Sequence, residues 1–185
     1  MIKSKRHKRK AEVEPTAVKG IFMRPMTEED HPFLLKLFGT TRERELEMVA
    51  EWTAEQKMEF IHFQWKAQLT HYQEHYPNAT HHILLKKETK DKQRETVPIG
   101  RLYVEREPDL IRLMDIALLP DYRNRGWGGQ LIQALLDEAA QHDQLVRLYV
   151  FKENHKAHQL YQRMGFQDLG EEGGLYLKME WRDSR

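Results

Sequence analysis

The sequence contains no cysteine among its 185 residues. Disulfide bonds, thiolate nucleophiles and cysteine-ligated zinc sites are therefore excluded. The absence suits a reducing compartment, and we expect a soluble, cytoplasmic protein. Long apolar runs are also missing, since no stretch approaches the ~18 residues of a membrane span. No apolar segment follows the N-terminal charges, so a secretory signal is not indicated. We expect no membrane association.

Acidic residues are missing from the first ten positions, which carry six lysines and arginines. The whole chain has a net charge of +1, so without these six charges the remainder is net −5. Charge blocks of this kind usually stay unfolded, and we expect a disordered basic arm over residues 1–17. A single domain is expected over 18–185. Contact of the arm with nucleic acid is an alternative, which the lack of stacking aromatics disfavours.

Stretches typical of strands and of helices alternate along the rest of the chain. Strand-like segments cover 18–26, 81–87, 97–107, 109–120, 145–151 and 174–181. Helical periodicity or capping signals mark 28–38, 40–52, 54–76, 130–142 and 154–164. Within 54–76, one regular stripe is formed by Met58, Ile61, Trp65, Leu69, Tyr72 and Tyr76, and we interpret its aromatic residues as core rather than as a substrate site. A charged loop is expected over 88–96. This order predicts an α/β (α+β) fold with a mixed, mostly antiparallel central sheet flanked by helices.

The stretch RNRGWGGQL, residues 123–131, places three glycines and two arginines between a strand and a helix. The free N–H groups of a helix N-terminus bind anions, and glycine lets an anion approach the backbone closely. The stretch therefore predicts a pyrophosphate cradle, with a turn that binds nothing as the alternative. No lysine and hydroxyl follow Gly128-Gly129, which excludes a nucleoside-triphosphate loop. Leu131 stands where a dinucleotide fingerprint needs its third glycine.

Three segments resemble the GNAT family of N-acetyltransferases. Arg123-Asn124-Arg125-Gly126-Trp127-Gly128 matches the R/Q-x-x-G-x-G/A motif of that family. DIALLPDYRNRGWGGQLIQALLDEA is similar to its cofactor strand, loop and helix, and RLYVFKENHKAHQLYQRMGFQDLG to its second signature. FMRPMTEEDHPFLLKLF is similar to its opening strand and helix. The resemblance covers residues 20–182 and implies a GNAT fold in which the cofactor strands splay apart.

The resemblance implies acetyl-CoA as the acetyl donor. Backbone N–H groups of the loop would hold the pyrophosphate, the strand 116–118 would pair with the pantetheine arm, and a bulge there would aim an amide at the thioester oxygen. The implied cofactor-binding residues are Ile116, Ala117, Leu118, Arg123, Asn124, Arg125, Gly126, Trp127, Gly128, Gly129 and Asn154. Trp127 needs no chemical role, since it can pack the helix or cover the loop.

Tyr161 is the catalytic candidate that the resemblance supports best, as the acid that protonates the CoA thiolate. The alternative is a core tyrosine. The positions where many relatives carry a general base hold Arg112 and Met114 here. Asp115 and Glu105 are the remaining candidates for the base. Each can equally be a surface or ion-pairing carboxylate, and a water chain to solvent is a further alternative.

The acceptor amine is less clearly indicated. In this family the acceptor site is built from the first helices and the last hairpin, here about 40–76 and 168–176. Glutamates recur every four residues from 43 to 59 and could attract a cation or form a solvated helix face. Among the histidines between 62 and 82, His71 and His75 have the i, i+4 spacing of a helical ligand pair, but the glutamate of a His-Glu-x-x-His motif is missing, and no metal is expected.

A small-molecule or peptide amine acceptor is therefore expected, with a homodimer as a possible assembly. The rival functions are a non-catalytic acyl-CoA-binding module and an adaptor that contacts nucleic acid through the basic arm.

Overall fold

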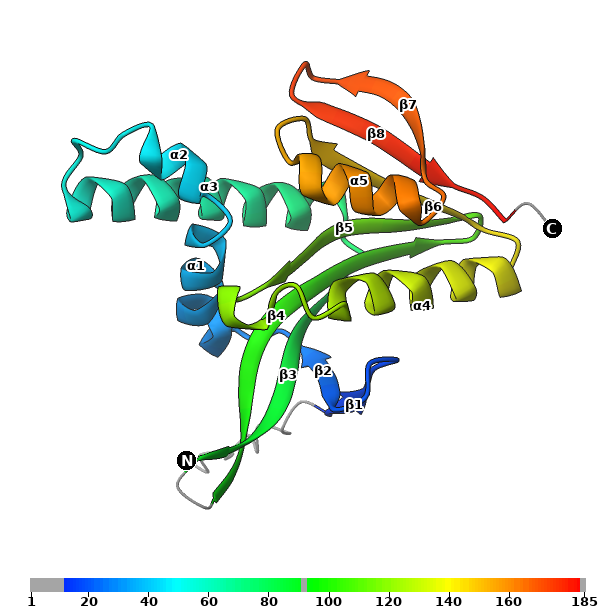
Figure 1. The fold of residues 1–185 in the computed structure, drawn as a ribbon, viewed down its shortest axis with the longest axis horizontal. Helices are drawn as coiled ribbons and strands as arrows, with labels where there is room; N and C mark the ends of the chain where they lie inside the picture. Colours follow the sequence, from blue (N-terminus) through cyan, green and yellow to red (C-terminus); the bar gives the residue numbers. More distant parts are fainter. Residues whose placement is uncertain (1–11, 91–92, 184–185) are drawn as a thin grey trace, which may run out of the picture.

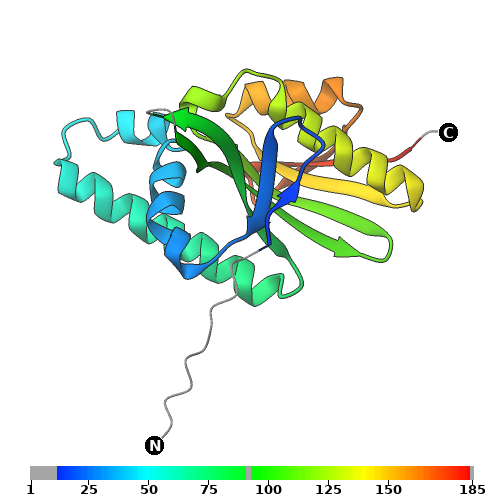
Figure 2. The same ribbon diagram turned by 90° about the horizontal axis from the view of Figure 1, so that it is seen from below.

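The computed structural model describes residues 12–90 and 93–183, which form an eight-stranded sheet with helices on both faces (Figures 1 and 2). The strands are β1 (Glu14–Pro15), β2 (Ile21–Pro25), β3 (Thr80–Lys90), β4 (Gln93–Glu107), β5 (Leu110–Leu118), β6 (Leu145–Phe151), β7 (Gln167–Glu172) and β8 (Tyr176–Trp181). The helices are α1 (His31–Gly39), α2 (Glu43–Glu47), α3 (Ala54–His75), α4 (Trp127–Gln141) and α5 (His155–Arg163), with 3-10 turns η1 (Glu28–Asp30) and η2 (Pro120–Tyr122).

The sheet has the order β1-β2-β3-β4-β5-β6-β8-β7, and all its pairs are antiparallel except β5 with β6. Side-chain alternation along the strands divides the core into two layers. On β3, Leu84 belongs to the layer beneath α4 and α5, whereas Ile83 and Leu85 belong to the layer beneath α1 and α3. The predicted fold class is confirmed.

Capping predicted from the sequence is present at both helical starts of the N-terminal half. The Thr53 N–H donates to Gln56 Oε1 at 2.9 Å, and the Gln56 N–H donates to Thr53 Oγ1 at 3.2 Å. At η1 the Thr27 N–H donates to Asp30 Oδ2 at 2.8 Å. The Asp30 carboxylate also forms a two-point ion pair with Arg24 at 2.7 Å, which ties the start of α1 to β2.

Three sequence predictions need correction. Within the loop expected over 88–96, residues 88–90 and 93–96 are instead strand: the antiparallel ladder continues through Glu88–Glu95 and Thr89–Arg94, since exposed charged side chains do not prevent backbone pairing. The helix expected over 40–52 shrinks to the five residues of α2, which separates the glutamates of the predicted row. Within the arm expected over 1–17, Glu14 and Pro15 instead form β1, which pairs with β2. The basic run 1–10 lies outside the described residues.

The sheet opens between β5 and β6. Their parallel pairing covers four residue pairs and ends at Leu113 and Leu148, although β5 continues to Leu118 and β6 to Phe151. The rest of β5 stays paired with β4 on its other side, from Leu113–Val104 to Leu118–Gly100. Beyond Leu113, β5 therefore has one paired edge and one edge that faces a gap, which confirms the predicted splay.

Gly100 allows β4 to hold this part of β5. A Cβ atom at this position would collide with the carbonyl oxygen of Ala117 and come within 2.7 Å of Leu118 Cδ2. Contacts this close force the backbone to move. The close approach of the β4 and β5 backbones therefore requires a glycine at position 100.

We expect Gly100→Ala to lower the free energy of unfolding by about 3 kcal/mol, at the upper end of the cost of overpacking. Urea unfolding followed by circular dichroism measures this change. The matched control is Gly39→Ala in α1, where the added Cβ would meet Ile61 Cγ2 at 3.8 Å, an ordinary contact. Equal stability of the two variants would contradict the role given to Gly100.

Candidate functional site

An open cavity of about 900 Å³ occupies the gap between β5 and β6. Its floor comes from the splayed strands at 113–116 and 148–151, and α5 contributes Ala157 and Tyr161. One wall is α3 with the adjoining α2, and the opposite wall is the β7–β8 hairpin. The cavity therefore lies where the predicted cofactor strand meets the two regions predicted to hold the acceptor.

The open edge of β5 presents backbone groups to this cavity. The Leu119 N–H donates to Ile99 of β4 at 2.8 Å. Since backbone groups alternate along a strand, Ala117 also faces β4, whereas Ile116 and Leu118 face the gap. The Leu118 carbonyl already accepts a hydrogen bond from Arg123 Nε at 2.8 Å. Ile116 lines the cavity and is placed to pair with an added extended chain.

A β-bulge lies just before this segment. The β4–β5 register passes from Tyr103–Asp115 to Val104–Leu113, so Met114 is the extra residue on β5. Its carbonyl accepts a hydrogen bond from the Tyr72 hydroxyl of α3 at 3.3 Å. The bulge thus lies two residues before the stretch expected from the sequence, and a helix side chain partners its carbonyl.

The glycine loop turns directly into α4. Asn124 and Gly126 have positive φ angles of 58° and 75°, and α4 begins at Trp127, three residues earlier than the sequence predicted. A Cβ atom at Gly128 would meet no atom within 4 Å. Packing therefore does not explain a glycine that costs a helix up to about 1 kcal/mol relative to alanine. An open, bare first turn of this kind fits a bound anion.

The side chains around this loop hold its shape. Arg123 Nη2 donates to the backbone oxygen and to Oγ1 of Thr40, at 3.0 and 2.7 Å. The Trp127 ring stacks on Tyr122 at 6.3 Å between ring centroids, and the Arg125 guanidinium lies 5.3 Å above Trp127. Arg123 therefore holds the loop against the end of α1, and Trp127 packs between Tyr122, Arg125 and the core beneath α4.

Tyr161 lines the cavity from α5 and packs edge-on against Phe166, with ring centroids 5.7 Å apart. Burial, and secondarily the charge of Asp115, raise the pKa of Tyr161 to about 12. The phenol is therefore protonated at neutral pH and can serve as a hydrogen-bond donor in the cavity. Asn154 also lines the cavity, and its Oδ1 caps α5 by accepting from the Ala157 N–H at 3.2 Å.

Asp115 lines the cavity and forms an ion pair with a buried arginine. Arg101 Nη2 donates to Asp115 Oδ2 at 2.6 Å, and Arg101 is only 2% exposed. Burial opposes the charged form of Arg101, but the Asp115 carboxylate outweighs it, and the pKa of Arg101 lies above its ordinary value. The pair places a carboxylate at the cavity and its counter-charge inside the sheet.

The structure places Glu105 away from the cavity lining. It is 5% exposed on β4, and its carboxylate accepts from Arg112 Nε at 3.1 Å. Arg112 is the residue of this pair that lines the cavity. The prediction that Glu105 reaches the cleft is therefore corrected: the side chain neutralises a cavity arginine.

Several tyrosines line the cavity that were not predicted from the sequence as site residues. Tyr72 and Tyr76 belong to a regular stripe on α3 that was interpreted as core, but both line the cavity. Of that stripe only Ile61 and Trp65 are buried, and Met58 is 61% exposed. Helical spacing reports that residues share a face, and it does not report whether protein or ligand covers that face.

The described residues show neither a metal-binding cluster nor a membrane-spanning helix. Across 12–90 and 93–183, no group of three or more histidine, aspartate or glutamate side chains is arranged to hold a metal ion. In the same part of the chain, no helix has the length and apolar character needed to cross a membrane.

Comparison with known proteins identifies the family and the fold. The model of the acetyltransferase (GNAT) family matches residues 46–166. Among solved structures, the PaiA N-acetyltransferase of Thermoplasma acidophilum in complex with coenzyme A is 16% identical, with a TM-score of 0.59 over 88% of this chain and 99% of that one. A search of curated proteins finds no match.

Two other structures show the same fold. Spermidine N-acetyltransferase of Vibrio cholerae, in complex with CoA and spermine, is 18% identical, with a TM-score of 0.55 over 90% of this chain and 98% of that one. RimL, a ribosomal L7/L12 alpha-N-protein acetyltransferase, is 15% identical, with a TM-score of 0.57 over 94% and 95%.

We expect Asp115→Ala to lower the free energy of unfolding by about 3–5 kcal/mol, because it leaves Arg101 buried without its counter-charge. The double variant Arg101→Met, Asp115→Leu removes both charges and is expected to recover most of that loss. Chemical denaturation of the two variants beside the parent chain measures the effect. A double variant no more stable than Asp115→Ala would contradict the coupling.

Proposed function

The chain belongs to the GNAT acetyltransferase family, and from this premise we propose that it transfers an acetyl group from acetyl-CoA to an amine. The observation that carries the proposal is the combination of an open β5 edge with a bare helix start at Gly128. One offers hydrogen bonds to an extended amide chain, and the other offers N–H groups to an anion. Coenzyme A contains both kinds of group: its pantetheine arm is an extended chain with amides, and the pyrophosphate that follows is an anion.

In the proposed complex the pyrophosphate lies on the N–H groups from 124 to 129, where the α4 dipole adds favourable charge. The Arg123 N–H already donates to the Pro120 carbonyl at 3.1 Å, and the Arg123 side chain supports the loop. The pantetheine arm pairs with Ile116, and Leu118 and Asn154 border it. Ala117 contributes through its place in the strand, since its backbone groups face β4. The thioester then reaches the bulge at Met114, close to Tyr161 and Asp115.

The proposed reaction is direct acyl transfer. The neutral amine nitrogen attacks the thioester carbonyl carbon, the new C–N bond forms, and the C–S bond breaks. The sulfur leaves with its electron pair and takes a proton from the Tyr161 hydroxyl. The amine loses one proton to Asp115, directly or through water, and this proton passes through water to the Tyr161 phenolate, which restores both groups. The products are an N-acetyl amide and CoA.

The acceptor is proposed to be an amine of a small molecule or a polypeptide. The fold accommodates both classes, since the similar structures include a spermidine and a ribosomal-protein acetyltransferase. We place the reaction in the cytoplasm, because the sequence has no cysteine that an oxidising compartment would cross-link.

One observation favours a second candidate, an acyl-CoA-binding module without catalysis. Asp115 is held by Arg101, and Glu105 lies outside the cavity lining, so neither carboxylate is a free base in the cavity. Incubation of acetyl-CoA with a panel of amines, with CoA thiol release measured over time, separates the two. Release that depends on the amine supports the transferase, and tight CoA binding without release supports the module.

Gly128→Glu tests the anion site. We expect CoA affinity to fall about tenfold or more in calorimetry, because a carboxylate at the open first turn would occupy the approach of the diphosphate and repel it. Gly128→Ala is the matched control, since alanine is the other residue that the R/Q-x-x-G-x-G/A motif allows at this position and its Cβ would meet no atom within 4 Å. Its CoA affinity is expected to stay close to that of the parent chain. Unchanged affinity in Gly128→Glu would argue against the loop assignment.

Tyr161→Phe tests the acid. We expect turnover to fall about 10²-fold with little change in CoA affinity, because the ring packing is kept and only the hydroxyl is lost. Stopped-flow thiol detection with calorimetry on the same sample gives both quantities. Turnover equal to that of the parent chain would remove Tyr161 from the mechanism.

A further inference from the structure

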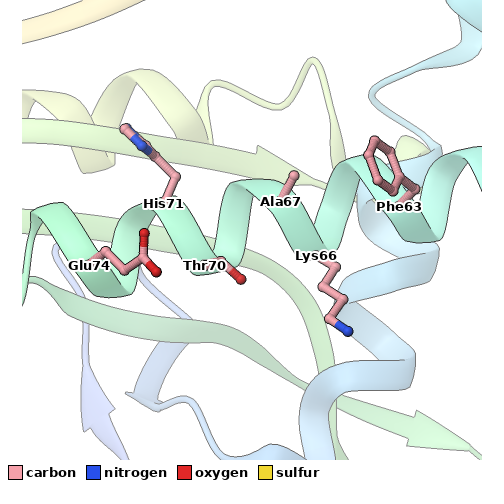
Figure 3. A pocket seen from close by; sticks show the side chains of 6 residues that line it. All are labelled: Phe63, Lys66, Ala67, Thr70, His71 and Glu74. Carbon is pink, nitrogen blue, oxygen red and sulfur yellow. The ribbon is translucent and has the colours of Figure 1, made fainter.

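A second hollow, of about 500 Å³, lies on the outer side of α3 (Figure 3). Its lining consists of two rows on the helix: Phe63, Ala67 and His71 on one side, and Lys66, Thr70 and Glu74 on the other. The first row also lines the reaction cavity. The two hollows therefore share one helical edge, and a surface runs without interruption from the reaction cavity to the outer face of α3. We call this second hollow the α3 groove.

The shape of the α3 groove suits an extended chain. Small side chains at Ala67 and Thr70 form its middle, and larger ones stand at both ends: Phe63 with Lys66, and His71 with Glu74. Eight residues of α-helix separate Phe63 from His71, about 12 Å. An extended polypeptide advances about 3.3 Å per residue, so the groove accommodates about three or four residues.

Phe63 gives independent support for a ligand here. Its side chain is 75% exposed, although α3 buries Ile61 and Trp65 on its opposite side. Phe63 therefore adds apolar surface without stabilising the core through burial. Across the mouth of the cavity stand two further exposed apolar side chains of the β7–β8 hairpin, Leu175 at 57% and Tyr176 at 40%. Exposed apolar side chains gathered around an opening mark an interaction site.

We propose that the acceptor amine is presented by a polypeptide, whose following residues lie in the α3 groove. This inference rests on the proposed acetyl transfer. The amine enters between Phe63 and the β7–β8 hairpin, an apolar side chain of the peptide contacts Phe63, and the chain continues over Ala67 and Thr70. Lys66 and Glu74 lie at opposite ends of the groove and favour opposite charges on the peptide. A small amine would fit within the reaction cavity and never reach Thr70.

The experiment compares acceptors of increasing length with acetyl-CoA under thiol detection. The probes are pools of peptide amides with randomised sequence and a free α-amine, one, two, four and six residues long. A second series has a blocked N-terminus and one lysine, which distinguishes the α-amine from the ε-amine. We expect kcat/KM per amine to rise about tenfold from one to four residues in one of the series and then to level off.

Thr70→Arg is the diagnostic variant, because Thr70 lines the α3 groove and not the reaction cavity. We expect it to remove the gain from length while leaving the one-residue rate unchanged. The matched control, Gln73→Arg, adds the same charge to an exposed position of α3 outside both linings and is expected to behave like the parent chain.

Equal rates at all lengths, with turnover still present, would overturn the peptide inference and leave the transferase standing. If none of the acceptors causes thiol release although CoA still binds, the proposed transferase activity itself is overturned. A dimer in light scattering that Thr70→Arg converts to monomer would show that a second copy covers the groove, which also overturns the inference.

Discussion

The end of β5–β6 pairing at Leu113 and Leu148 is the constraint on which the site depends. Each strand continues for several residues beyond the last pair, so backbone donors and acceptors are left without a strand partner. Unpaired groups of this kind are costly when buried and cheap when they face water or a ligand. The gap therefore has to remain an open cavity, and the elements around it have to hold the strands apart.

Three contacts from other elements maintain that separation. β4 draws the end of β5 toward itself through the close approach at Gly100. Tyr72 of α3 partners the carbonyl at the bulge, and burial raises the pKa of its phenol, so it stays a donor. Arg101 balances Asp115 from inside the sheet. Each of these three points on β5 is thereby fixed by a neighbour that does not belong to β6.

The fold class and most helices and strands were predicted from local signals: periodicity, capping residues and turn glycines. The splay was predicted from the resemblance to the GNAT family, and α4 begins three residues before its predicted start. The predictions were wrong where a contact with another part of the fold determines the local structure. The charged residues 88–90 and 93–96 form strand because two backbones pair there, and Glu105 does not line the cavity because it forms an ion pair with Arg112, its partner across the ladder. Tyr72 and Tyr76 were assigned to the core because a helical stripe carries no information about what covers it. The proposed roles of Tyr161, Asp115 and the loop residues stay predictions.

The guanidinium of Arg123 joins two parts of the molecule that the chain separates by nearly eighty residues. It bonds to Leu118 at the end of the open strand and to Thr40 at the end of α1, where the chain turns toward α2 and the acceptor wall. A displacement of the loop would therefore strain the hydrogen bonds between Arg123 and Thr40 at the end of α1. A movement of α2 and α3 that shifts Thr40 would strain the loop through the same hydrogen bonds. In the proposed complex, the donor and acceptor sides of the cavity would share this one set of hydrogen bonds, and any effect of one ligand on the binding free energy of the other would be matched by an equal effect in return.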